Sequence, residues 1–124
     1  MNIAAVSKRK LVKLFEYWHV DNYMATPLYN YLVHGYSPGG FWTKVLEDKF
    51  LDAMVSCSEN NRVLDMKNAS RFIVNCFPTR SYGSEYYVSE WLKLTDDERR
   101  KILEDNDLIY TPEQETWETI KGDE

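Results

Sequence analysis

The chain of 124 residues lacks most of the side chains that build metal and disulfide sites. It has two cysteines, Cys57 and Cys76, and two histidines, His19 and His34. No CxxC or HxxxH spacing occurs, so the sequence offers no recognisable zinc site. Both cysteines fall on the apolar stripes of predicted helices, where a free thiol behaves as a small hydrophobe. We therefore expect no disulfide, no metal and no cofactor.

Long apolar runs are also missing. No stretch approaches the roughly 18 residues that a membrane span requires. Residues 1–18 carry their charges inside a helical pattern, with no apolar region after them, which is not the pattern of a signal peptide. These absences predict a protein of the cytoplasm without membrane partners.

Nothing in the sequence has the arrangement of a catalytic site. No serine or cysteine lies in a recognisable nucleophile elbow, and paired carboxylates occur only in capping or surface contexts. His19 and His34 each lie near the end of a predicted helix, where the dipole favours a protonated ring. No P-loop and no GxGxxG after a strand is present. We predict that the protein is not an enzyme.

Strand-like alternation of apolar and polar residues is absent apart from Leu108–Tyr110, whereas helix start and stop signals are frequent. The pattern predicts an all-α fold, a single compact domain of about seven short helices over residues 1–124. The expected starts are Ser7, Thr26-Pro27, Ser37-Pro38, Ser84 and the capping boxes Thr95–Glu98 and Thr111–Gln114; the expected stops are Gly35, residues 58–61, Pro78 and Gly122. The helix opened by Ser37-Pro38 is expected to run to Cys57, and the last helix to bury Trp117 and Ile120.

Charge is unevenly distributed along the chain. Residues 1–93 carry 11 Lys/Arg against 9 Asp/Glu, a balance of +2, whereas residues 94–124 carry 4 against 11, a balance of −7, and the two sum to the net −5. A nucleic-acid-binding domain normally has a basic surplus, which this chain lacks. The N-terminal lysines lie on the polar side of a predicted helix, which favours a solvated face.

Aromatic residues are abundant, at 15% with nine Tyr and four Trp. Some of these rings are expected at a binding surface, because Tyr and Trp provide large contact area at low entropic cost. The same composition favours a homodimer or higher homo-oligomer.

Two predicted helix starts contain glycine and suggest an anion site. Helix N-termini present unpaired N–H groups and a partial positive charge, and glycine lets a ligand approach the backbone. Arginine forks match phosphate, and exposed rings stack on bases. The candidate ligand-binding residues are Tyr36, Ser37, Gly39, Gly40, Trp42, Arg71, Arg80, Tyr82, Gly83 and Ser84. The alternative is structural: Gly39 and Gly40 only allow two helices to pack closely, and Gly83 only allows a turn.

The acidic C-terminal part suggests a different mode of binding. Asp96, Asp97 and Glu98 are candidates for docking on a basic partner protein. The alternative is that they occupy the first turn of a capped helix, where acidic residues stabilise the dipole.

A pattern within residues 31–93 resembles a family of short uncharacterised proteins of tailed bacteriophages. It reads YLxxGxxPGxF, then VL, NxxP, GS and WL. The matching residues are Tyr31-Leu32, Gly35, Pro38-Gly39, Phe41, Val45-Leu46, Asp48, Ala53, Asn61, Asn75, Pro78, Tyr82–Ser84, Val88 and Trp91-Leu92. The chain departs from the family at Glu47–Phe50, where an Asn-Asp-Leu step is usual, and at Tyr82, where Trp is common. Residues 94–124 form an acidic helical extension.

The resemblance implies a phage origin and action in the host cytoplasm, and it gives no site residue. By analogy we expect a small non-catalytic accessory protein in counter-defence, which sequesters a nucleotide-type signal or binds a host defence protein. Inhibition of a host factor by the acidic helices and a purely structural role in assembly are the alternatives.

Overall fold

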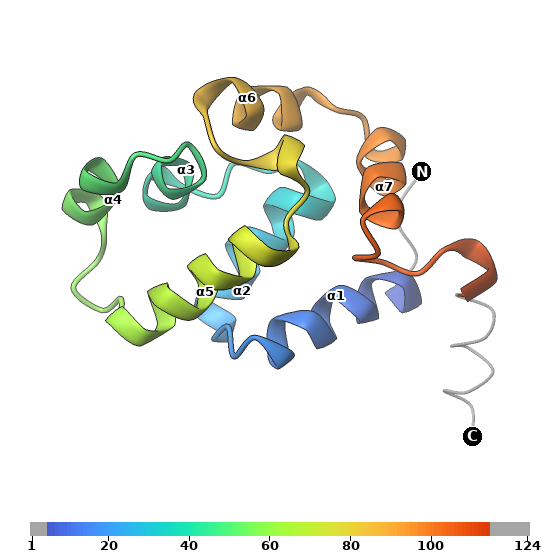
Figure 1. Ribbon diagram of the computed structural model, residues 1–124, viewed down its shortest axis with the longest axis horizontal. Coiled ribbons are helices and arrows are strands. Elements are labelled where there is room, and N and C mark those ends of the chain that lie inside the picture. The colour runs from blue at the N-terminus through green and yellow to red at the C-terminus, as the bar shows by residue number, and fades with distance from the viewer. Residues whose placement is uncertain (1–4, 115–124) are drawn as a thin grey trace.

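The computed structural model describes residues 5–114 and is all-α over that range (Figure 1), which confirms the predicted fold class. The elements in chain order are α1 (Ala5–Tyr17), α2 (Asn22–Tyr29), the π-helix η1 (Asn30–His34), α3 (Gly40–Leu46), α4 (Phe50–Ser56), α5 (Val63–Cys76), the 3₁₀-helix η2 (Thr79–Ser81), α6 (Glu85–Lys93) and α7 (Asp96–Asp105). Leu108–Tyr110, which the sequence marked as a possible extended piece, forms no strand, and Leu108 and Ile109 are buried.

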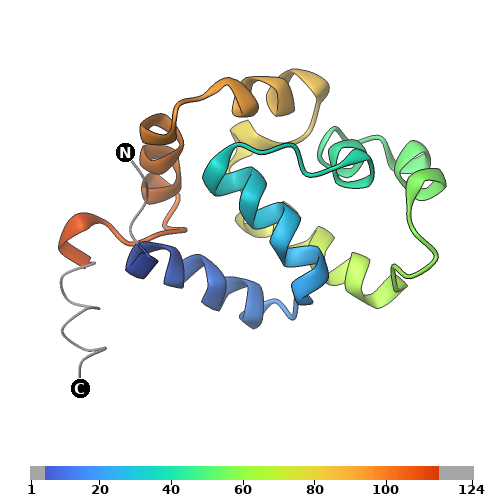
Figure 2. The ribbon, with the colours of Figure 1, turned by 180° about the vertical axis from the view of Figure 1, so that it is seen from behind.

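The segment formed by α2 and η1 runs through the middle of the molecule. The other helices surround it: α5 crosses on one face, α1 and α6 lie on opposite sides, and α3–α4 and α7 lie at opposite ends (Figures 1 and 2). Leu28, Tyr31, Leu32 and Val33 are almost fully buried there. This position makes α2–η1 the scaffold on which the other elements pack.

Hydrogen bonds from distant residues fix the central segment. The Tyr31 hydroxyl donates to the carbonyl oxygen of Ser81 at 2.6 Å, and the Trp91 indole N–H donates to the carbonyl oxygen of Tyr31 at 3.0 Å. All three residues are buried. Burial, and then the charge of Glu47, raises the pKa of the Tyr31 phenol well above its usual range. Each bond satisfies a polar group that would otherwise be orphaned in the core.

Most of the helix caps are as predicted. Gly35 has the left-handed conformation, with φ 68°, directly after η1. The Ser84 side chain accepts from the N–H of Tyr87, and Thr95 and Glu98 form a reciprocal capping box. The side-chain and backbone groups of Thr111 and Gln114 pair in the same way. Trp117, Ile120 and Gly122 lie outside the described residues.

Three predicted helix starts are wrong. Among the described residues, α1 already includes Ala5 and Val6, so Ser7 lies inside the helix and is not its cap. Helix α2 begins at Asn22, with Asp21 as its cap, so Pro27 lies inside it. That helix continues through the proline because Met24 and Leu28, one turn apart, are both buried. Helix α3 is preceded by Gly39, with φ 90°, and not by Ser37.

The single helix predicted from Ser37 to Cys57 is also wrong, because it is two helices. Helix α3 ends at Leu46, Asp48 has a left-handed φ of 64°, and α4 begins at Phe50. Aspartate is one of the few non-glycine residues that tolerate this conformation. The chain therefore turns between α3 and α4, and apolar side chains of both helices line the site described next.

Candidate binding site: an apolar groove between α3–α4 and α5

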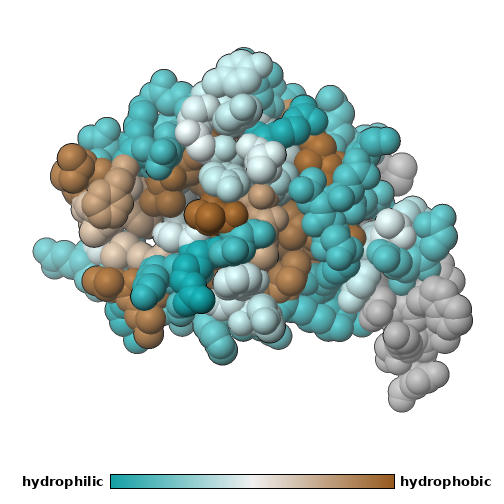
Figure 3. All heavy atoms as spheres, in the orientation of Figure 1, coloured by the Kyte–Doolittle hydropathy of each residue, from teal (hydrophilic) through white to brown (hydrophobic). Residues whose placement is uncertain are grey.

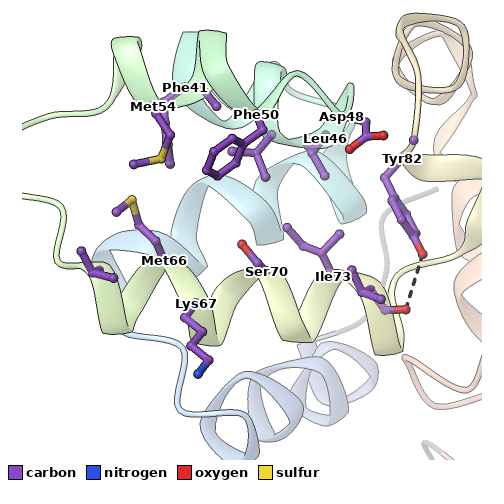
Figure 4. A pocket seen from close by; sticks show the side chains of 15 residues that line it. Phe41, Leu46, Asp48, Phe50, Met54, Met66, Lys67, Ser70, Ile73 and Tyr82 are labelled. Carbon is purple, nitrogen blue, oxygen red and sulfur yellow. Dashed lines mark hydrogen bonds between the residues drawn. The ribbon is translucent and has the colours of Figure 1, made fainter.

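An open groove of about 530 Å³ separates α3 and α4 from α5 (Figure 4). Its lining is mainly apolar and comes from three helices and the loop before α6: Phe41, Val45, Leu46, Phe50, Ala53, Met54, Val63, Met66, Ile73, Val74, Tyr82 and Gly83, with Asp48, Lys67 and Ser70 as the charged or hydroxyl members. A cavity of this size, with a few polar groups in an apolar wall, is typical of a binding site.

The break between α3 and α4 gives the groove its shape. The N–H of Gly83 donates to the carbonyl oxygen of Leu46 at 2.7 Å, which ties the end of α3 to the loop before α6. The Lys49 ammonium pairs with Glu85 at the start of α6. That hydrogen bond raises the pKa of Lys49 and lowers the pKa of Glu85. Helix α4 is thereby held away from α5, and Met54 and Met66 point toward one another across the gap (Figure 4).

Around the groove, large apolar side chains are exposed to solvent. The exposed fractions are 87% for Val55, 76% for Leu51 and Val63, 70% for Phe50, 67% for Val74, 66% for Leu64 and 40% for Met54. We call these seven residues the apolar patch. Figure 3 shows apolar side chains gathered on both sides of a hollow over α4 and the start of α5. Monomeric soluble proteins rarely expose so large a contiguous apolar surface without a binding role.

Charged and hydroxyl groups lie at defined points along the groove. Asp48 is at the end near Tyr82, Lys67 is toward the opposite end, and Ser70 lies between them (Figure 4). Among residues 5–114, neither Asp48 nor Lys67 forms a side-chain ion pair. The Tyr82 hydroxyl donates to the carbonyl oxygen of Val74 at 3.4 Å. The groove therefore offers one unpaired charge of each sign.

The predicted ligand-binding residues do not converge on one pocket. Tyr82 and Gly83 line the groove, but Arg71 lies in a separate cavity of about 370 Å³ beside Trp18. There its guanidinium carbon is 5.9 Å from the Trp18 ring centroid. Arg80 is exposed in η2 and lines neither cavity, and Ser84 caps α6 through its own side chain.

Around the first predicted glycine-lined start, the structure provides little for a ligand to bind. Tyr36 stacks on His34 with ring centroids 5.3 Å apart, and the Trp42 ring is only 6% exposed, so it does not offer a face to a base. Ser37 is exposed and lies outside α3. Helix α3 has seven residues, so its dipole is short.

Gly39 and Gly40 are not there to permit close packing. A Cβ atom added to either residue would meet no heavy atom within 4 Å. Gly39 is explained by its φ of 90°, which residues with a Cβ rarely adopt. The packing alternative for these two glycines is therefore wrong.

Two of the three acidic candidates at the start of α7, Asp96 and Glu98, have internal roles. The Asp96 carboxylate pairs with Arg99. Glu98 closes the capping box, and its pKa is lowered first by hydrogen bonds with the backbone and side chain of Thr95, then by the charges of Arg80 and Arg99. This favours the first-turn alternative over a docking surface.

Arg99, in the first turn of α7 after the capping box, is a buried cation, 4% exposed. Its guanidinium donates to the carbonyl oxygens of Val33 at 3.4 Å and His34 at 3.2 Å, and also to that of Leu94. These carbonyls end η1 and α6, where the orphan oxygens carry partial negative charge. Through these buried hydrogen bonds, Arg99 of α7 connects the C-terminal ends of η1 and α6.

The described residues contain no cluster of three or more His, Cys, Asp or Glu that would hold a metal ion. Both cysteines are free and partly buried; Cys76 packs on the core, and the Cys57 thiol donates to the carbonyl oxygen of Met54. None of the helices within residues 5–114 has the length and apolarity to cross a membrane.

The sequence did not reveal the groove, because its pattern assigned Phe41 to Cys57 to one buried stripe. A signal was present in Phe50–Val55, where apolar residues cover about half the helix circumference, more than a single core stripe uses. Comparison of the chain with known protein families, with characterised proteins and with solved structures finds no match.

Proposed function

We propose that this protein acts without catalysis, by binding another polypeptide at the groove between α3–α4 and α5. The observation that carries the proposal is the apolar patch: seven large side chains exposed by 40–87% around one open groove. Leaving such a surface in water is unfavourable, and covering it provides the main driving force for association.

The extent of the patch favours a polypeptide over a small ligand. Leu51, Val55 and Leu64 do not line the groove, so a molecule that filled it would leave them exposed. A protein surface would cover both the groove and these flanking side chains. The resemblance to phage proteins adds the expectation that this binding takes place in a host cell.

The test is a titration with the apolar dye 1-anilinonaphthalene-8-sulfonate at low protein concentration. We expect saturable fluorescence enhancement that falls in a Phe50→Ser, Met54→Ser double variant and also in a Leu51→Ser, Val55→Ser double variant. Val12→Ser is the control, because Val12 is 45% exposed on α1, away from the groove. Loss of signal only in the first variant would instead support a small-molecule cavity.

A nucleotide screen by thermal shift tests the competing anion-binding hypothesis. A ligand that binds only the folded state raises the melting temperature by mass action. We expect no rise with nucleotides at millimolar concentration. A rise that Arg80→Ala abolishes, in a variant that still folds, would overturn the groove as the recognition site.

A further inference from the structure

The apolar patch has the features of a self-complementary surface, one that fits a second copy of itself. It combines the groove with Leu51 and Val55, which do not line the groove and are exposed by 76% and 87%. In a twofold dimer the same patch is used on both protomers, so the apolar side chains around one groove cover those around the other.

The area of the patch is appropriate for a stable dimer. If a fully exposed Val, Leu, Met or Phe presents about 150–200 Å², the seven side chains together expose roughly 800 Å², close to one partner's share of a standard interface. The patch is also more apolar than a typical transient interface, and apolar enrichment is characteristic of homodimers.

The two unpaired charges of the groove fit the same symmetry. Asp48 and Lys67 lie toward opposite ends, with Ser70 between them (Figure 4). A twofold axis that passes midway between them brings Asp48 of one protomer to Lys67 of its partner, and the reverse, so two ion pairs form. Opposite charges at matching positions fix the register of an association that apolar contact alone leaves undefined.

From these observations we infer that the protein forms a twofold dimer in which the groove between α4 and α5 of each protomer faces that of the other, so that the two apolar patches cover one another. This inference rests on the proposed function and names its partner as a second copy of the chain. Phe50 and Met54 become buried at the centre, and the Asp48–Lys67 pairs close its two ends.

The experiment is sedimentation equilibrium of the full chain from about 1 to 200 µM, with far-UV circular dichroism as a check of folding. We expect a reversible dimer whose dissociation constant rises at least tenfold in Val55→Glu and in Leu51→Glu. Both residues are so exposed that either substitution leaves the fold intact. The control Val12→Glu adds the same charge on α1 and should not change the dissociation constant.

A charge test fixes the register. Lys67→Glu places an acidic group opposite Asp48 and should weaken the dimer, whereas the double variant Lys67→Glu, Asp48→Asn should recover part of the loss. Asparagine tolerates the left-handed φ of residue 48. Equal weakening by both variants would overturn the proposed axis.

The dye titration separates failure of this inference from failure of the proposed function. If the dimer forms, dye fluorescence per molecule falls as protein concentration rises through the dissociation constant. A protein that stays monomeric at the highest concentration and still binds dye at the patch overturns the dimer and leaves the groove as a site for another polypeptide. A monomer that binds no dye overturns both.

Discussion

Alanine substitutions at three glycines separate two reasons for which a chain needs glycine. Gly35 has both: a left-handed φ of 68°, and a crowded surrounding in which an added Cβ atom would lie 2.6 Å from Cζ of Arg99. Gly39 has only the conformational reason, with φ 90° and open space around it. Gly40 has neither a left-handed φ nor a neighbour within 4 Å.

The expected costs follow from these local differences. A left-handed conformation costs a residue with a Cβ about 1–2 kcal/mol, which is the expected loss for Gly39→Ala. In Gly35→Ala the displaced Arg99 also loses one hydrogen bond from a charged group, about 1.5–3 kcal/mol, so the total is about 2.5–5 kcal/mol. Gly40→Ala should stabilise the protein by about 0.5–1 kcal/mol, because alanine restricts the unfolded chain.

Urea unfolding monitored by tryptophan fluorescence gives all three values under one condition. For a domain of this size, Gly35→Ala should also lower the melting temperature by roughly 10–20 °C. A Gly35→Ala loss no larger than that of Gly39→Ala would refute the role assigned to Arg99. A clear destabilisation by Gly40→Ala would show that Gly40 has a close neighbour after all.

Two further predictions concern buried and capping groups. Tyr31→Phe should cost about 1–3 kcal/mol, because it leaves the Ser81 carbonyl without its donor. Burial raises the pKa of Tyr31, so its contribution to the free energy of unfolding is complete below about pH 10 and is lost as pH rises beyond that value. The free energy of unfolding should therefore fall more steeply at alkaline pH in the wild-type protein than in the variant. Thr95→Ala should cost about 1 kcal/mol by urea unfolding. Because hydrogen bonds with Thr95 lower the pKa of Glu98, the contribution of Glu98 to the free energy of unfolding is present above pH 4.5 and disappears as pH falls below that value. The free energy of unfolding should therefore fall less steeply at acid pH in Thr95→Ala than in the wild-type protein.

Local signals allowed the sequence to predict the fold class and most helix ends. Gly35, Ser84 and Thr95 perform the capping roles that their residue types indicate. Each of these depends on neighbours within four residues, so the information is present in a short window. Pro27 gave a misleading start signal, because burial of Met24 and Leu28, a tertiary effect, outweighed it.

The candidate site could not be predicted, because it results from a helix break whose cause is not local. Residues 47–49 look helical in sequence, and the break is stabilised by Gly83 and by Glu85, the latter 36 residues from its partner Lys49. The buried role of Arg99 is hidden for the same reason, since its acceptors at Val33 and His34 lie 66 and 65 residues earlier. Hydrogen bonds and ion pairs between residues far apart in the sequence therefore determine both the break between α3 and α4 and the buried position of Arg99.

The hydrogen bonds of η1 also have a consequence for synthesis on the ribosome. Ser81, Trp91 and Arg99, which complete the bonding of Tyr31 and Val33, follow these residues by 50, 60 and 66 positions. The central segment is therefore translated long before its partners emerge, and the entropy of closing these loops must be overcome at a late stage. A nascent chain that stops before Arg99 lacks the hydrogen bonds that complete the end of η1, so α7 is an integral part of the fold.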